Sequence, residues 1–448
     1  MDIQQGARTP GVARAGGQAS GSALGRRQLL KMGAAVLSLP TIITPRALGA
    51  DGATPASERL TLGFIGMGRQ MGGHVGMFLG REQCQVVAVC DVESRRLEKS
   101  KARVDEYYAK KTGYAYTGCA AYGDYRELLA RDDIDAIVIA TPEHWHALNV
   151  VDAANAGKDI YCEKPLSHTI HEARAMARAV RRNGVVFQTG SQQRSERGFR
   201  VACELVRNGR IGKVHTVHVN VGGTCVDCYL PAQPTPETLN WDMWLGPAPY
   251  RAYHEDIAPP MEYEGWPNWR AYRDYAGGMM TDWGAHHFDI AQWGLGMDDS
   301  GPVEIYPPDD SNERLTYVYA NGVVMQHGGG GKAGVAFIGD AGRVMVDRGY
   351  LETDPAHLVN ELPGPNELRL YESDSHADNW LECIRTRRLP ICDVEIGART
   401  IAVCHLGNIA YHLKRPLNWD PAKEVFVGDS EANRNLSKAM RSPWTLGA

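Results

Sequence analysis

Between residues 60 and 190 the chain alternates short apolar runs with stretches of helical periodicity. Each apolar run has the length of a strand and is followed by glycine or polar residues. The segments Ala147–Ala156 and Thr169–Asn183 predict helices, and Thr169 with Glu172 has the spacing of a capping box. Strands that alternate with helices predict a parallel, doubly wound sheet. The expected strands are 60–65, 85–90, 134–140 and 159–162.

The pattern changes after Gly190. A helix is expected over Gly198–Asn208 and a strand over Val214–Val221, and a loop-rich stretch then precedes four more short strands. Asn321-Gly322 lies between two of these strands and is typical of a hairpin turn, so a mostly antiparallel sheet is expected. The four strands are expected at 315–320, 323–328, 335–338 and 342–346, and further helices at 376–385 and 397–413.

Residues 1–50 show neither the helical nor the strand pattern of apolar residues. Arg26-Arg27 precedes a short apolar stretch, Met32–Ile43, and small residues up to Ala50 offer a cleavage site. The paired arginines resemble the twin-arginine export signal. We therefore expect a signal peptide at 1–50, handled by the twin-arginine export machinery, and a periplasmic or extracytoplasmic mature protein. A buried amphipathic N-terminal helix is the alternative.

Composition excludes several classes of protein. The 448 residues are 43% hydrophobic and 23% charged, as in globular proteins that bury a core. The first 50 residues hold six of the 48 basic and one of the 53 acidic residues, so the net charge is −5 with them and −10 without them. This balance argues against a nucleic-acid partner. No apolar run is long enough for a multi-spanning membrane protein.

Cysteine spacing gives no metal site. Cys225 and Cys228 form the one close pair among ten cysteines, and no second pair follows at zinc-finger spacing. A disulfide formed late and two free thiols both remain open for this pair. We expect no bound metal.

A glycine-rich turn follows the first expected strand. Gly66-Met67-Gly68-Arg69-Gln70-Met71 precedes a helical pattern, and glycines there let the backbone approach a pyrophosphate. Asp91 ends the second strand, where a carboxylate accepts ribose hydroxyls and repels a 2′-phosphate. The turn thus predicts a dinucleotide site with NAD favoured, while Arg95 and Arg96 keep NADP open. Met71 stands where the usual motif has its third glycine.

Polar residues also follow the third and fourth expected strands. Thr141-Pro142-Glu143-His144-Trp145-His146 follows one, and Glu163-Lys164-Pro165 follows the other. Ligands of parallel sheets bind beyond the carboxyl ends of the strands, so these segments should meet the glycine turn. Pro165 prevents helix continuation, which holds Lys164 on a rigid strand end where its ammonium can bond a substrate hydroxyl. A surface Glu–Lys pair is the alternative.

These motifs, in this order, resemble those of the glucose–fructose oxidoreductase / inositol dehydrogenase / rhizopine-catabolism (Gfo/Idh/MocA) family, from about Leu60 to about Leu417. The resemblance implies an α/β protein: a Rossmann domain with a doubly wound parallel sheet at 58–190, and an α+β domain with an open, mostly antiparallel sheet at 191–430. Residues 431–448 would be a C-terminal tail. The second sheet would bind substrate and support a homo-oligomer, a dimer or tetramer.

The resemblance also implies site residues. Glu163 would lie near the nicotinamide ribose, Ser191-Gln192-Gln193-Arg194 would face the nicotinamide, and Lys164, Asp282 and His286 would be catalytic. The expected cofactor-binding residues are Gly66, Met67, Gly68, Arg69, Gln70, Met71, Asp91, Thr141, Pro142, His146, Glu163, Lys164, Gln192 and Arg194.

The segment Gly277–Ile290 reads as one helix with Asp282 and His286 on the same face. A carboxylate one turn from an imidazole can orient it and raise its basicity, so His286 is the expected general base. Two alternatives remain. His286, His287 and Asp289 could form a metal site, which adjacent histidines on different helix faces disfavour, or the histidines belong to the core.

The loop-rich stretch 222–275 holds several tryptophans and prolines. Aromatic faces suit the C–H faces of a sugar, so a sugar or polyol substrate is expected. Its expected binding residues are Lys164, Arg270, Tyr272, Asp282, His286 and His287. Each tryptophan has a core or oligomer contact as its alternative role.

Export bears on the reaction, because an exported enzyme meets no pool of free nicotinamide cofactor. We expect an NAD(P)-dependent oxidoreductase that acts on a sugar or polyol CH–OH group through a tightly bound cofactor. A redox-neutral NAD-dependent glycosidase is the alternative, although the Tyr-Pro-Thr-His-Ser stretch of such relatives does not occur. A non-catalytic carbohydrate-binding protein of the same fold is the second alternative.

Overall fold

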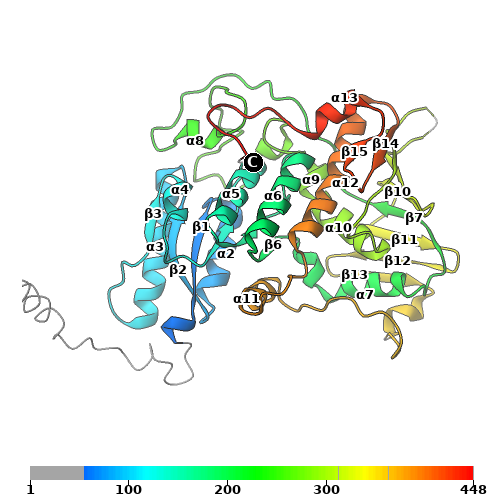
Figure 1. Ribbon diagram of the computed structural model, residues 1–448, viewed down its shortest axis with the longest axis horizontal. Coiled ribbons are helices and arrows are strands. Elements are labelled where there is room, and N and C mark those ends of the chain that lie inside the picture. Colours follow the sequence, from blue (N-terminus) through cyan, green and yellow to red (C-terminus); the bar gives the residue numbers. More distant parts are fainter. Residues whose placement is uncertain (1–54, 311, 362, 447–448) are drawn as a thin grey trace, which may run out of the picture. The chain divides into compact units, whose positions relative to one another are not determined.

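The computed structural model describes residues 55–310, 312–361 and 363–446. The expected signal peptide at 1–50 lies outside the described residues. The elements below belong to the unit Glu58–Ala448, which contains two sheets (Figure 1). Within the residues described, no helix is both long and apolar enough to cross a membrane.

Six parallel strands form the first sheet, in the order β3-β2-β1-β4-β5-β6 (Figure 1). This is the strand order of a Rossmann fold, so the expected doubly wound sheet is confirmed. The strands are largely apolar because helices pack on both faces of the sheet. Their bounds are β1 Leu60–Ile65, β2 Cys84–Cys90, β3 Ala120–Tyr122, β4 Ala136–Ile139, β5 Asp159–Cys162 and β6 Phe187–Thr189.

Five helices connect these strands, and a sixth comes from far along the chain. Helix α11, His376–Thr386, packs on the same face as α2, where Trp380 is fully buried. The Trp380 ring lies 5.7 Å from the rings of Phe78 and Tyr161. The core of the first sheet therefore needs residues well beyond 190. The five local helices are α2 Arg69–Leu79, α3 Ser94–Thr112, α4 Tyr125–Leu129, α5 Glu143–Asn155 and α6 Ile170–Asn183.

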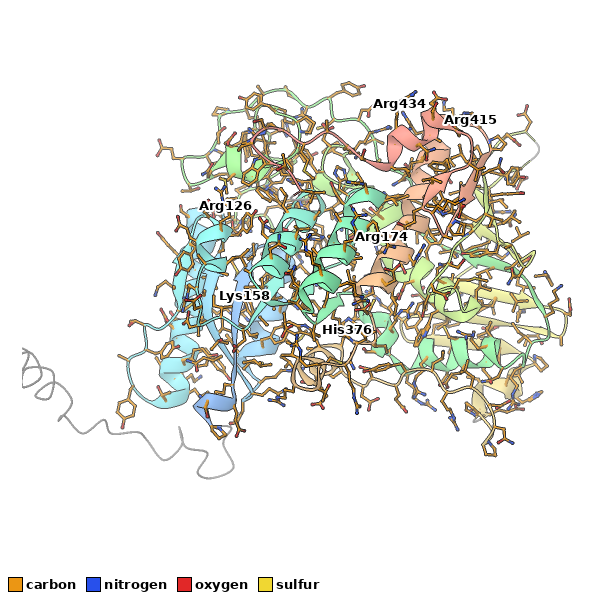
Figure 2. All side chains as sticks on the ribbon, in the orientation of Figure 1. Arg126, Lys158, Arg174, His376, Arg415 and Arg434 are labelled. Carbon is orange, nitrogen blue, oxygen red and sulfur yellow. The ribbon has the colours of Figure 1, made fainter. Side chains whose placement is uncertain are left out.

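Helix α6 begins with the expected cap. Thr169 Oγ1 accepts from Glu172 N at 3.1 Å, and the Glu172 carboxylate accepts from His168 N at 2.9 Å. Arg174, labelled in Figure 2, extends from α6 and bonds to Glu395 and Glu424 of the second half. The helix thus joins the two halves of the unit.

Nine strands form the second sheet, in the order β13-β12-β11-β7-β10-β9-β8-β14-β15. Only β7 and β10 pair in parallel, and all other neighbours are antiparallel, which confirms the expected mostly antiparallel sheet. The bounds are β7 Val214–Val219, β8 Glu304–Tyr306, β9 Thr316–Val318, β10 Val324–His327, β11 Val335–Gly339, β12 Gly342–Asp347, β13 Tyr350–Asp354, β14 Leu417–Asp420 and β15 Val425–Phe426.

The single helix expected over Gly277–Ile290 is wrong. The segment forms α9, Met279–Asp282, and α10, Gly284–Leu295, with Trp283 between them. The Asp282 carbonyl leaves the helical ladder because it accepts a bond from Lys164, and His286 N donates to the Trp283 carbonyl instead. The other helices of this half are α7 Arg197–Arg207, α8 Trp241–Leu245, α12 Val394–Leu413 and α13 Ser430–Asn433, and the 3₁₀ turns are η4 Gln192–Ser195, η5 Asn268–Ala271, η6 Ala356–Asn360 and η7 Arg434–Leu436.

The described part of the expected tail, 431–446, packs back on the first half instead of extending from the fold. The Trp444 ring is buried 4.8 Å from the ring of Trp145 on α5, and Arg441 donates to the Gly246 carbonyl at 3.0 Å. Apolar burial of Trp444 gives the segment a structural role that its irregular sequence did not indicate.

Candidate active site

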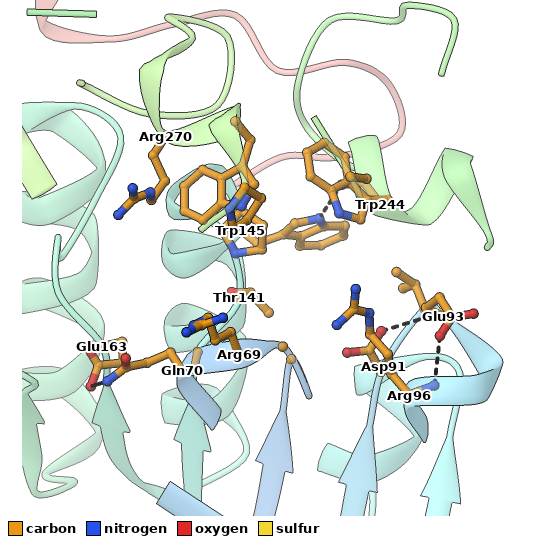
Figure 3. A pocket seen from close by; sticks show the side chains of 18 of the residues that line it. Arg69, Gln70, Asp91, Glu93, Arg96, Thr141, Trp145, Glu163, Trp244 and Arg270 are labelled. Carbon is orange, nitrogen blue, oxygen red and sulfur yellow. Dashed lines mark hydrogen bonds between the residues drawn. The ribbon is translucent and has the colours of Figure 1, made fainter. Parts of the chain in front are cut away.

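A cleft of about 650 Å³ lies at the carboxyl ends of the strands of the first sheet. Residues that follow β1, β2, β4 and β5 form one side, and residues from the second half form the other. Figure 3 shows Arg69, Gln70 and Asp91 on the strand side and Arg270 and Trp244 across from them. The strand ends therefore meet as the sequence predicts.

The glycine turn has the geometry that a dinucleotide needs. Gly66 has a φ of +85°, and a Cβ there would lie 2.8 Å from Thr141 N, so only glycine fits. A Cβ on Gly68 would meet nothing within 4 Å, which leaves open space above the turn. Arg69 begins α2 at this point, so the helix N-terminus borders the cleft. The arrangement fits a pyrophosphate.

Asp91 holds the turn from the end of β2. Its carboxylate accepts from Met67 N at 2.6 Å and from Glu93 N at 2.8 Å (the latter contact is drawn in Figure 3). Burial raises the pKa of Asp91, although these two bonds and Arg96 act in the opposite direction. A carboxylate has further lone pairs, so Asp91 can still accept ribose hydroxyls.

Most of the expected cofactor-binding residues line the cleft. They are Gly66, Gly68, Arg69, Gln70, Asp91, Thr141, Pro142, His146, Glu163, Lys164 and Gln192.

Three expected cofactor residues do not line the cleft. Met67 donates its main-chain N–H to Asp91. Met71 lies on the face of α2 that packs against the sheet, so its side chain is fully buried in the core. Arg194 is 1% exposed and bonds to Asp289 at 2.8 Å and to Asp298 at 2.7 Å. Arg194 therefore joins η4 to α10 and stabilises the fold.

Glu163 is fixed by a residue that the sequence did not single out. Its Oε1 lies 2.7 Å from Nε2 of His74 on α2 and accepts from Gln70 Nε2 at 3.2 Å. Burial acts to raise the pKa of Glu163, but the bond and charge of His74, together with Lys164, hold that pKa below its usual value. The carboxylate therefore stays ionised beside the cleft.

Lys164, Arg270, Asp282 and His286 meet in one part of the cleft, which we call the charged end. Lys164 Nζ donates to Asp282 Oδ1 at 2.7 Å and to its carbonyl at 3.2 Å. Arg270 Nη1 donates to Asp282 Oδ2 at 2.9 Å. One buried carboxylate thus fixes two cations, one from each half of the unit.

The expectation that Asp282 orients His286 is wrong. Both Asp282 oxygens bond to Lys164 and Arg270, and Nδ1 of His286 is buried with no hydrogen-bond partner among the described residues. Burial, and then the charges of Lys164 and Arg348, lower the pKa of His286 well below its usual value. The imidazole is therefore neutral at pH 7 and able to accept a proton.

Two expected substrate residues lie away from the cleft lining. His287 Nδ1 is 2.9 Å from the Asn220 carbonyl, and the Tyr272 hydroxyl donates to Asp256. The metal alternative for His286, His287 and Asp289 also lacks support, because the Asp289 carboxylate bonds to Arg194. Cys225 and Cys228 are both free thiols.

Several cleft residues escaped the sequence analysis. Trp283 and Arg348 border the charged end, and Trp266 lies across from the glycine turn. Glu143 begins α5 and accepts from Gly277 N and Thr281 Oγ1, both at 3.3 Å, and burial followed by Asp282 raises its pKa well above the usual value. Glu143 could have been found from the sequence, because it belongs to the Thr-Pro motif. Arg348 is a lone arginine in a hairpin turn, and no motif near it indicates a role in a site.

Residues 236–270, which we call the covering segment, are tied to the first half by main-chain bonds. Ser94 N donates to the Thr238 carbonyl and Asn240 N to the Val92 carbonyl, both at 2.9 Å. These bonds fix the segment to the loop after β2, close to Asp91. The covering segment therefore lines the cleft on the side of Asp91.

Trp266 ties the covering segment to the glycine turn. Two guanidinium groups contact its ring, with Arg69 Cζ at 5.2 Å and Arg270 Cζ at 5.3 Å from the centroid. Arg69 also reaches the Gly265 carbonyl at 3.5 Å. The stack spans the cleft between the two halves.

Comparison with known proteins places the chain in a family. The family profile described as "Oxidoreductase family, NAD-binding Rossmann fold" matches residues 60–191, and the profile described as "Oxidoreductase family, C-terminal alpha/beta domain" matches residues 220–446.

Curated relatives match only part of the chain. The uncharacterized oxidoreductase YrbE of Bacillus subtilis strain 168 is 32% identical over 164 residues, 36% of this chain and 44% of that protein. Glycosyl hydrolase family 109 protein 2 of Shewanella sp. strain ANA-3 is 32% identical over 177 residues, 38% of each chain. The chain thus matches less than half the length of these relatives.

Solved structures show the same fold over most of the chain. The WlbA dehydrogenase from Bordetella pertussis, in complex with NADH and UDP-GlcNAcA, has a TM-score of 0.56 at 18% identity and covers 81% of this chain and 99% of its own. The aldose-aldose oxidoreductase from Caulobacter crescentus has a TM-score of 0.55 at 19% identity, covering 80% and 99%. With both profiles matched in order, the chain belongs to the Gfo/Idh/MocA family of oxidoreductases and carries its NAD-binding Rossmann fold.

Proposed function

We propose that the protein is an oxidoreductase that transfers hydride between a CH–OH group of a sugar or polyol and a tightly bound NAD(P). The observation that carries the proposal is the charged end, where Lys164 from the end of β5 and His286 from α10 line one cleft with the strand ends of an NAD-binding fold. Asp91 favours NAD over NADP, because its carboxylate faces the site where a 2′-phosphate would lie.

The protein residues divide the acid–base work. His286, neutral because of its lowered pKa, accepts the hydroxyl proton of the substrate. Lys164 donates a hydrogen bond to the same oxygen and stabilises negative charge that develops there. Asp282 keeps the ammonium of Lys164 oriented through the 2.7 Å bond. The nicotinamide supplies the hydride acceptor when it is bound.

The covering segment supports a cofactor that stays bound between turnovers. The Trp266 contacts with Arg69 and Arg270 and the main-chain bonds of Ser94 and Asn240 hold this segment against the glycine turn and the loop after β2, which would slow dissociation of a dinucleotide. A retained cofactor suits an exported enzyme, so we also propose that residues 1–50 direct twin-arginine export to the periplasm. A second carbonyl substrate would then reoxidise the cofactor in place.

We further propose a homo-oligomer, a dimer or tetramer. Helices α7, α10 and α12 contact the second sheet, and its nine strands offer an extended face for a second copy. Light scattering of the purified protein tests this proposal, and a monomer at micromolar concentration contradicts it.

The proposed activity is tested with the purified mature protein. Mass spectrometry of the released ligand should find NAD or NADP, and candidate sugars should reduce it, as read from nicotinamide fluorescence. Added aldose acceptors should restore the oxidised form, and a keto-sugar or lactone should accumulate. A preparation without bound or bindable dinucleotide would contradict the proposal and favour the carbohydrate-binding alternative.

A redox-neutral glycosidase is the second candidate. The similarity to glycosyl hydrolase family 109 proteins of Shewanella over about a third of the chain favours it. Such an enzyme would release phenol from aryl glycosides without added cofactor or acceptor. Phenol release that Lys164→Ala abolishes would support this candidate over the net oxidoreductase.

A further inference from the structure

Arg348 is a cation at the charged end that the proposed reaction does not use. It lies in the turn between β12 and β13, on the second sheet, and lines the cleft together with His286. Its guanidinium lies over the ring of Trp283, 4.8 Å from the centroid. Trp283 separates α9 from α10, so Arg348 lies beside the junction of the two helices that carry Asp282 and His286.

The guanidinium is held in place by neutral groups. With their carboxamide oxygens turned toward it, Gln192 accepts from Nη2 at 3.1 Å and Gln193 accepts from Nε at 3.2 Å. A guanidinium has five N–H groups, so three remain, including both on Nη1. The contacts fix the side chain while leaving the outer edge of the fork available to a ligand.

No carboxylate of the described residues forms an ion pair with Arg348. Asp347 is its neighbour, but that carboxylate accepts from the Arg348 main-chain N at 2.7 Å and lies 3.7 Å from His287 Nε2. Burial raises the pKa of Glu196 and the charge of Arg348 acts in the opposite direction, but the two side chains form no ion pair. The residue Arg348 is itself exposed, so its free edge is open to the cleft.

Arg348 is the cation of the charged end that has no carboxylate partner among the described residues. Lys164 and Arg270 share the carboxylate of Asp282, and Arg348 adds a third cation. A neutral sugar would leave the guanidinium of Arg348 without an ion pair, whereas a substrate with its own carboxylate would provide one. A planar guanidinium fork suits the two oxygens of a carboxylate.

We propose that the substrate is an acidic sugar or polyol of the uronate or aldonate type, whose carboxylate binds Arg348 while a CH–OH group of the same molecule faces Lys164 and His286. The inference rests on the proposed oxidoreductase function and specifies its substrate class. Arg348 acts as a specificity residue. The hydride leaves a carbon other than the carboxylate carbon and goes to the nicotinamide, and the proton leaves the hydroxyl oxygen on that carbon and goes to His286.

The test compares matched acid and neutral sugars on the protein with its cofactor bound. Glucuronate against glucose and galacturonate against galactose are followed by nicotinamide fluorescence, with glucose 6-phosphate as a third anion. We expect the acids to react with a kcat/KM at least about tenfold above their neutral partners, since a charge-assisted bidentate contact is worth roughly 10- to 100-fold. Preference for the phosphate would replace the carboxylate assignment and overturn the proposal.

Variants assign the preference to Arg348. Arg348→Ala should lower kcat/KM for the acids at least about tenfold more than for the neutral sugars, chiefly through KM, and Arg348→Lys should restore part of the difference. Arg343→Ala is the matched control, because Arg343 lies on β12 but faces Asp354 and does not line the cleft. An equal loss on acid and neutral substrates in Arg348→Ala would show a merely structural role.

A binding measurement separates this proposal from the proposed function. Calorimetry with glucuronate on His286→Ala should detect binding that is lost in the His286→Ala/Arg348→Ala double variant. If neutral sugars were oxidised better than the acids, the oxidoreductase function would stand and the acidic substrate would be overturned. Bound glucuronate without any cofactor reduction in the wild type would support the carboxylate site and contradict the oxidoreductase function.

Discussion

The two halves of the unit build the cleft by different means. The first half contributes groups that sit at strand ends, such as Gly66, Asp91 and Glu163, where the main chain itself sets their position. The second half contributes side chains that fix one another, such as Arg270 bonded to Asp282 and Arg348 stacked on Trp283. The position of a residue at a strand end can therefore be predicted from the nearby sequence. A network of side chains, in contrast, forms only after the two halves have packed.

Lys164 and His286 are where the two halves meet, so their removal should have the largest effect. Lys164→Ala and His286→Ala should each lower turnover by about 10²- to 10⁴-fold, the usual scale for a lost acid–base group. Steady-state kinetics with cofactor bound measures this, and Lys110→Ala on the exposed face of α3 is the control. Near-normal turnover in either variant would mean that the two halves do not each supply a catalytic residue.

A variant of Arg194 tests whether this residue stabilises the fold or binds the cofactor. Arg194→Gln should lower the free energy of unfolding by about 3–5 kcal/mol, because it leaves Asp289 buried without its partner. Denaturant unfolding measures the loss. The NAD dissociation constant of the folded variant should stay within about twofold of the wild type, and a selective loss of NAD binding would restore Arg194 to the cofactor site.

Asp91 tests the contribution of a strand end. Asp91→Asn keeps the side-chain size but removes the charge that accepts ribose hydroxyls and repels a 2′-phosphate. NAD should bind roughly tenfold or more weakly, while NADP should lose less or gain. Dissociation constants for both cofactors decide the matter, and equal losses would refute the ribose role of Asp91.

Trp266 tests whether the covering segment retains the cofactor. Trp266→Ala removes two cation–π contacts, each worth about 0.5–1 kcal/mol at exposed sites, so NAD dissociation should accelerate by about 5- to 30-fold. Stopped-flow displacement measures the rate. Tyr250→Ala is the control, because Tyr250 is exposed in the same segment and does not line the cleft. An unchanged rate of NAD dissociation would mean that the Trp266 contacts do not retain the cofactor.

The pH profile gives the smallest effect and tests the electrostatics of the charged end. His286 must be neutral to accept a proton, and burial with Lys164 and Arg348 lowers its pKa well below 6.5. The kcat/KM should therefore stay level as the pH falls through about 6.5 and decline only below it. Arg348→Ala removes one cation, so the pKa of His286 rises and the acid limb moves to higher pH. A wild-type limb centred at 6.5 would contradict the lowered pKa.

Sequence patterns predict the features that depend on interactions between neighbouring residues. Apolar runs of strand length, the Thr169 cap and the glycines around Gly66 each depend on neighbours in the chain, and all appear where the patterns predict them. Residues at strand ends follow from this, because parallel strands bring their carboxyl ends to one edge of the sheet.

Which charges meet depends on how distant segments pack in the folded protein. Helical spacing suggested that Asp282 serves His286, but Lys164 comes from 118 residues earlier and competes successfully for the same carboxylate. Arg194 and Tyr272 have the right residue types in the right segments, yet packing turns them to Asp289 and Asp256. Trp266 and Arg348 carry no motif at all. Interactions between segments far apart in the chain depend on distances that folding sets, and sequence spacing does not encode those distances.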